Sequence, residues 1–94
     1  MISWDYSPRC ISPHVLPARS HSETLTWHPL RRDRQARVAR WTCDCDTLFY
    51  ELRQAGGLRF IRRTRRHHAI DKSDRWQAQE ADAMWIALLH GLVR

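Results

Sequence analysis

The stretch TLFYELRQAGGLRFIRRTR, residues 47–65, decides the fold expected for this 94-residue chain. Residues 47–54 and 58–65 contain aromatic and β-branched residues, as strands do. Between them, the Ala-Gly-Gly sequence at 55–57 is the clearest turn in the chain, because glycine adopts a left-handed backbone at little cost. The stretch therefore predicts an antiparallel β-hairpin.

The length of the turn decides which side chains share a face of this hairpin. A three-residue loop with Gly57 in the left-handed conformation pairs Leu52 with Phe60. One face is then apolar and carries Leu48, Tyr50, Leu52, Leu58 and Phe60. The other face carries Arg53, Arg59, Arg63 and Arg65 around Phe49, Glu51 and Ile61. A two-residue loop would pair Leu52 with Ile61 and place arginine on both faces, so the burial of apolar side chains favours the three-residue loop.

Two further elements flank the hairpin. Residues 36–43 alternate polar and apolar side chains and predict a first strand. Residues 74–91 predict a helix, with Asp74 and Gln77 as a capping box and Gly91 as its C-terminal cap. Its apolar stripe consists of Ala78, Ala81, Trp85, Leu88 and Leu92. A sheet with one apolar face must bury that face, and the apolar stripe of this helix can pack against it.

The expected fold class is α+β: a three-stranded antiparallel meander packed on one C-terminal helix, in the order β-β-β-α. The predicted core places Trp85, Leu88 and Leu92 against Tyr50, Leu52 and Phe60. Residues 66–73 are expected to form a loop. Residues 1–26 show no sustained period and predict an irregular or disordered arm before a domain at 27–94. A domain this small buries only about 60% of its unfolded surface, so a homodimer contact, nucleic acid or metal would help to stabilise it.

The charge of the chain is unevenly distributed. There are 16 Lys+Arg against 10 Asp+Glu, a formal net charge of +6, and Lys72 is the one lysine. Residues 31–66 alone hold 11 Arg against four acidic residues, a net charge of +7. Residues 67–94, which include the predicted helix, have a net charge of −1. A basic sheet beside an acidic helix predicts an anionic partner on the side of the sheet.

Nucleic acid is the partner that this pattern favours. Neighbouring arginines such as Arg53 and Arg59 repel each other unless an anion lies between them, and phosphates supply that anion. The predicted binding residues on the sheet are Arg53, Arg59, Arg63 and Arg65. Those in the preceding segment are Arg31, Arg32, Arg34, Arg37 and Arg40. Guanidinium groups on a β-ribbon also reach base edges in the major groove, so we expect a small basic protein that binds duplex DNA.

The β-β-β-α order of residues 36–92 is similar to that of the amino-terminal domains of some tyrosine recombinases, which dock a three-stranded sheet into the DNA major groove. This similarity is one of architecture, and no site residue follows from it. Double-stranded RNA-binding domains also end in this order, but they use a lysine cluster at the start of the last helix. Here that position holds Asp74-Arg75-Trp76-Gln77, so the sequence favours DNA over RNA.

The alternative is a protein-interaction module. Such a protein would be a small inhibitor or accessory factor, for example from a bacterial or mobile-element genome, that binds an acidic partner through arginine and tryptophan. The chain has five Trp, more than a small core is expected to hold. Trp4, Trp27 and Trp76 lie outside the predicted core and are the candidate interface anchors.

The cysteines and histidines raise the question of a metal site. Cys43 and Cys45 lie at the first predicted turn, while His67 and His68 follow the third strand, at the same edge of a meander. Two thiolates with imidazole ligands suit tetrahedral zinc. A single residue between the cysteines is fewer than zinc sites ordinarily use. We therefore expect no cofactor, with zinc on this set of four as the alternative.

The sequence predicts neither an enzyme nor a membrane segment. Glu51, His67, His68 and Asp71 are titratable residues near the basic surface, but no spacing makes them a catalytic set. No apolar run approaches the roughly 18–20 residues that span a membrane, and residues 1–20 lack the apolar core of a signal peptide. Three cysteines, an odd number, do not form a secreted disulfide framework, so a cytoplasmic location is expected.

Overall fold

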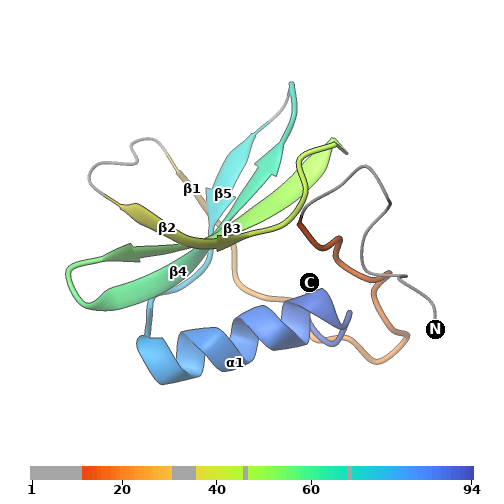
Figure 1. The fold of residues 1–94 in the computed structure, drawn as a ribbon. Helices are drawn as coiled ribbons and strands as arrows, with labels where there is room; N and C mark the ends of the chain where they lie inside the picture. The colour runs from red at the N-terminus through yellow and green to blue at the C-terminus, as the bar shows by residue number, and fades with distance from the viewer. Residues whose placement is uncertain (1–11, 31–35, 46, 68) are drawn as a thin grey trace.

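An antiparallel sheet and one C-terminal helix make up the computed structural model of the protein, which describes residues 12–30, 36–45, 47–67 and 69–94 (Figure 1). The elements are β1 (His28–Pro29), β2 (Arg37–Trp41), β3 (Leu48–Ala55), β4 (Leu58–Arg65), β5 (Ile70–Lys72), β6 (Trp76–Gln77) and α1 (Ala78–Leu89). The strands pair in the order β1-β5-β4-β3-β2, and β6 also pairs with β4. The expected α+β class is confirmed, but the described sheet has six strands where the sequence predicts three.

The three strands that the sequence does not reveal are only two or three residues long. β5 and β6 pair with β4, and β1 pairs with β5. Segments this short show no alternation. β5 and β6 pair because β4 offers a row of backbone groups along its second edge, and β1 pairs with the outer edge of β5. The expected loop at 66–73 is therefore wrong at Ile70–Lys72. The expected helix start at Asp74 is also wrong, because Trp76–Gln77 is extended and α1 begins at Ala78.

The hairpin between β3 and β4 closes with a two-residue turn. Gly56 and Gly57 have φ angles of +58° and +80°, the left-handed backbone that a type I′ turn needs at both central positions. Leu52 consequently lies opposite Ile61 rather than opposite Phe60. The predicted three-residue loop is wrong by one residue, and a shift of one residue moves every side chain of β4 to the other face.

The apolar core lies between the sheet and α1. It consists of Tyr50, Leu52, Ile61, Ala81, Trp85, Leu88 and Val93. The predicted burial of Trp85 and Leu88 is confirmed. The predicted place of Phe60 in this core is wrong: the register turns it to the opposite face, where it is buried beneath the guanidinium of Arg75. Leu92 is also wrongly predicted, since it follows the helix and is exposed.

The two ends of α1 differ in how their backbone groups are satisfied. The N-terminal end has no side-chain cap, so the capping box predicted from Asp74 and Gln77 does not form. At the C-terminal end, Gly91 has φ +74° and its amide donates to the carbonyl of Leu88. The glycine cap expected there is confirmed. Among the described residues, no helix is long and apolar enough to span a membrane.

Residues 12–27, here called the arm, run past the C-terminal end of α1 (Figure 1). The amide of Leu16 donates to the carbonyl of Leu89 at 3.0 Å, and the amide of Arg19 donates to the carbonyl of Gly91 at 2.8 Å. Three apolar side chains of the arm pack against the core, namely Val15, Leu25 and Trp27. The arm is thus attached to the domain by both backbone hydrogen bonds and apolar contacts.

Candidate functional site

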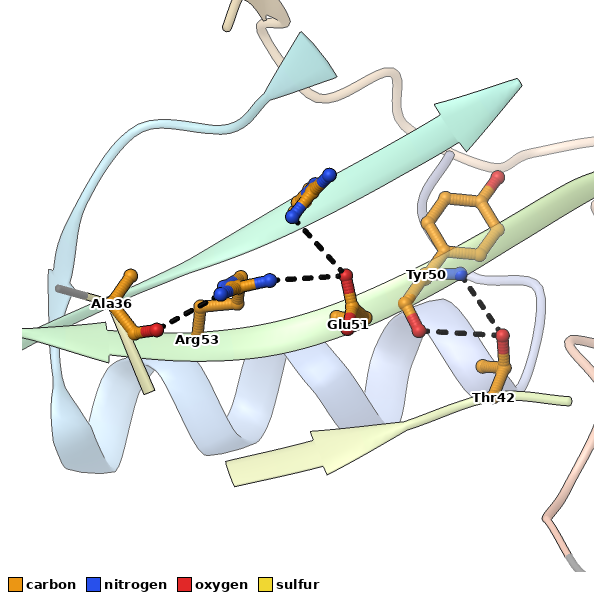
Figure 2. A network of polar contacts seen from close by, with 6 residues as sticks. Ala36, Thr42, Tyr50, Glu51 and Arg53 are labelled. Atoms are coloured by element: carbon orange, nitrogen blue, oxygen red, sulfur yellow. Dashed lines mark hydrogen bonds and ion pairs between the residues drawn. The ribbon is translucent and has the colours of Figure 1, made fainter. Parts of the chain in front are cut away.

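Arg53, the first predicted DNA-binding residue of the sheet, lies on the face that is turned away from α1 (Figure 2). Its Nη1 donates to Glu51 Oε1 at 3.3 Å, and its Nη2 donates to the carbonyl of Ala36 at 2.9 Å. The same carboxylate oxygen lies 3.8 Å from Nη1 of Arg62. The side chain of Arg53 is only 12% exposed. Its charge is therefore engaged within the protein and largely shielded from solvent.

The other three predicted sheet arginines lie on the face that packs against α1. Nη1 of Arg59 is 2.7 Å from Oδ1 of Asp82 on the helix. Arg63 and Arg65 share Oδ2 of Asp71, at 2.8 and 3.2 Å. The structure therefore does not bring the four arginines together on one open face. The two-residue turn places Arg53 on the opposite face from Arg59, Arg63 and Arg65, and each of these three lies beside a carboxylate.

The two described arginines of the preceding segment are in a different environment. Arg37 and Arg40 lie on β2, an edge strand that is exposed along its whole length. Neither guanidinium has an acidic partner among the residues that the structure describes. Trp41, the next residue, is 52% exposed. Arg31 and Arg32, together with Arg34, lie outside the described residues.

The cysteines of the candidate zinc set do meet a histidine, but a different one from those predicted. Cys43 and Cys45 lie beside His14 of the arm, with all three ligand atoms within 4.8 Å of one another. His67 is described and does not belong to this group, and His68 lies outside the described residues. The partner was not identifiable from spacing, since His14 is separated from Cys43 by the whole segment that includes β1 and β2.

A cavity of about 500 Å³ opens beside this cluster. His14 and Cys43 form part of its wall, and Tyr50 and Leu88 of the core also line it. Burial raises the pKa of Tyr50, and the nearby positive charge of Arg63 lowers it by a smaller amount. The wall of the cavity thus contains two potential metal ligands, His14 and Cys43, together with the phenol of Tyr50 and the apolar side chain of Leu88.

The buried phenol predicts a loss of stability in alkaline solution. The pKa of Tyr50 is raised above its ordinary value of 10.0, so above that pH the folded protein holds a proton that the unfolded chain has lost. The free energy of unfolding is expected to be independent of this group below about pH 10 and to fall as the pH rises further. Urea unfolding between about pH 8 and about pH 11 measures this slope.

Tyr50→Phe is the matched control, because it removes the titrating hydroxyl and keeps the ring. Its free energy of unfolding is expected to fall less steeply with alkaline pH than that of the natural chain. Equal slopes in the two proteins would contradict this role for Tyr50.

Comparisons with known proteins identify no relative. No protein family, curated protein or solved structure matches this chain.

Proposed function

We propose that this protein binds nucleic acid, with duplex DNA as the favoured form, through the exposed arginines of β2. The observation that carries the proposal is the exposure of Arg37 and Arg40 on an edge strand beside Trp41. Guanidinium groups that are free of carboxylates can bind phosphates with paired hydrogen bonds and release counterions as they do so. Arg31 and Arg32 precede β2 in the sequence and remain predicted members of the same basic surface.

The interior arginines of the sheet have a structural role in this proposal. Arg63 is bound to Asp71 and stacks over Trp27, with its guanidinium carbon 4.2 Å from the ring centre. Arg59 forms an ion pair with Asp82 of α1, with 2.7 Å between Nη1 and Oδ1. Replacing Arg59 would remove the ion-pair partner of Asp82, and replacing Arg63 would leave the buried Asp71 with Arg65 alone. Either substitution tests the fold rather than binding. The proposed function is therefore tested on β2.

Arg37→Glu combined with Arg40→Glu is expected to weaken DNA binding and to lower its salt dependence. If each arginine contacts one phosphate, the slope of log affinity against log salt falls by about 2. Fluorescence anisotropy with a labelled duplex, titrated at about 50 mM and about 200 mM salt, measures both quantities. Single-stranded DNA and duplex RNA of the same length establish which form is preferred.

The matched control replaces Arg19 and Arg94 by Glu. Both residues are exposed, and the double variant changes the net charge by the same amount without touching β2. It is expected to bind DNA more tightly than the β2 variant does. An equal loss in the two variants would refute a site on β2, and no binding of any nucleic acid at low salt would refute the proposed function.

An acidic protein is the second candidate partner, and a groove between β2 and α1 favours it. This groove has a volume of about 680 Å³ and exposes Trp41 and Ile86. Trp27 and Trp76, two of the anchors predicted from the sequence, instead pack against the core. Capture of an acidic protein after nuclease treatment, lost in Trp41→Ala, would support this candidate. Unchanged capture by that variant would count against it.

A further inference from the structure

Three potential metal-ligand atoms, two sulfurs and one imidazole nitrogen, converge where the arm meets the connection between β2 and β3. Sγ of Cys45 lies 3.3 Å from Nε2 of His14, and Sγ of Cys43 lies within 4.8 Å of both. Tetrahedral zinc, with bonds of about 2.3 Å to sulfur and about 2.0 Å to nitrogen, holds such atoms about 3.5–3.8 Å apart. The three side chains therefore need only small rotations to reach a common metal ion.

The one-residue spacing of the cysteines is compatible with this convergence. The chain bends at Asp44 and Cys45, and Sγ of Cys43 and Sγ of Cys45 lie within 4.8 Å of each other, so both can reach one ion. A conventional zinc hairpin needs wider spacing because it supplies its paired ligands from a tight turn. Here the third ligand comes from the arm, and the predicted contribution of His67 and His68 is not required.

The backbone on either side of the ligands is held in place. The amide of Cys43 donates to the carbonyl of Pro13 at 2.9 Å, which fixes the two chain segments against each other. Thr42 is buried, and its hydroxyl accepts a hydrogen bond from the amide of Tyr50 at 3.0 Å. Nη2 of Arg66 donates to the carbonyl of Asp44, between the two cysteines, at 2.7 Å. Because the chain is already ordered at the site, metal binding costs little conformational entropy.

We propose that His14, Cys43 and Cys45 bind one zinc ion through Nε2 and two thiolates. As the two sulfur–zinc bonds form, two thiol protons pass to the solvent. The dication and two thiolates sum to zero charge, so the half-buried site gains no net charge. A set of two cysteines and one histidine leaves the fourth position of zinc open, and His14 and Cys43 lie on the wall of the cavity described above. A small exchangeable ligand, such as water, takes that position.

This proposal is independent of DNA binding, because it uses none of the arginines of β2. Its consequence is a cross-link between the arm and the β2–β3 connection, which are far apart in the sequence. Calcium and magnesium prefer oxygen ligands and are not expected to compete.

The experiment measures zinc bound to the full chain, purified under reducing conditions and equilibrated with zinc. Metal analysis after removal of free ion is expected to give one zinc per chain. Replacement by cobalt(II) is expected to give the visible absorption of a tetrahedral site and a thiolate charge-transfer band. His14→Ala and Cys45→Ser are each expected to weaken zinc binding by at least about 100-fold, because loss of an outer-shell partner alone costs about 10–100-fold and these residues are direct ligands. Circular dichroism of each variant without metal shows that it is folded.

Two control variants make the assignment specific. His67→Ala removes an exposed histidine that was predicted from sequence but lies outside the cluster. Cys10→Ser removes the remaining thiol of the chain. Both are expected to bind zinc as the natural chain does. Substoichiometric zinc in the natural chain, unchanged affinity in folded His14→Ala, or loss of zinc in Cys10→Ser would each overturn the proposal.

Discussion

Trp85→Ala is expected to lower the free energy of unfolding by about 4 kcal/mol, the size of effect seen when a fully buried aromatic side chain is removed. Trp85 is 3% exposed and packs in the core with Leu52, Ile61 and Leu88. A small helix cannot close the space that the indole leaves, because its neighbours are already packed against the sheet. Domains of this size have few kcal/mol of stability to lose. Much of the variant is therefore expected to be unfolded at 25 °C.

Urea unfolding followed by circular dichroism measures this effect, and Ile86→Ala is its control. Ile86 is the next residue of α1, but it is 55% exposed and faces the solvent. Its replacement by alanine keeps the helix propensity and is expected to change stability by less than about 0.5 kcal/mol. Similar losses in the two variants would contradict the assignment of Trp85 to the core.

The parts of the fold that follow from local patterns are those that the sequence predicts well. The bounds predicted for the last strand, 58–65, are those of β4, since this segment contains aromatic and β-branched residues and a glycine pair precedes it. The helix is predicted from its apolar stripe, and Trp85 and Leu88 fall on its buried side as expected. Each of these elements is long enough to show its own local pattern.

The predicted register between β3 and β4 is wrong because the true register depends on ion-pair partners that are distant in the sequence. Burial of apolar side chains alone favours a register that keeps arginine away from the helix. In the structure Arg59 lies on the face that packs against α1, where it forms an ion pair with Asp82 of the helix. Arg63 lies on the same face and forms an ion pair with Asp71. No local sequence pattern predicts these ion pairs. The two consecutive glycines were the stronger signal, since a type I′ turn needs a left-handed backbone at both central positions.

The candidate site was predictable only in part for a related reason. The sequence places Cys43 and Cys45 together, because only one residue, Asp44, lies between them. It could not supply His14, which reaches them through the path of the arm. The sequence predicts an irregular or disordered arm at residues 1–26, and no local pattern there indicates where it would dock. The docking position is set by the carbonyl groups at the end of α1, which accept the amides of the arm.

Gly91→Ala is expected to lower the free energy of unfolding by about 3 kcal/mol, through two separate effects. Gly91 has φ +74°, and alanine in this conformation costs about 1–2 kcal/mol. A methyl group there would also overlap the carbonyl oxygen of Pro17 and lie 3.1 Å from its carbonyl carbon. Since both atoms belong to backbone, the arm must move, and the 2.8 Å bond from the amide of Arg19 to the carbonyl of Gly91 is weakened.

Gly57→Ala separates these two effects. Gly57 has a similar φ of +80°, but nothing lies within 4 Å of the added methyl group. The free energy of unfolding of Gly57→Ala is therefore expected to fall only by the conformational cost of alanine, about 1–2 kcal/mol. Urea unfolding of the two variants measures the difference between them. Because that difference reports how closely the arm is packed on the end of α1, Gly91→Ala is also expected to speed proteolysis within residues 12–27. Equal stability of the two variants, with unchanged cleavage of the arm, would show that the arm does not contribute to the stability of the fold.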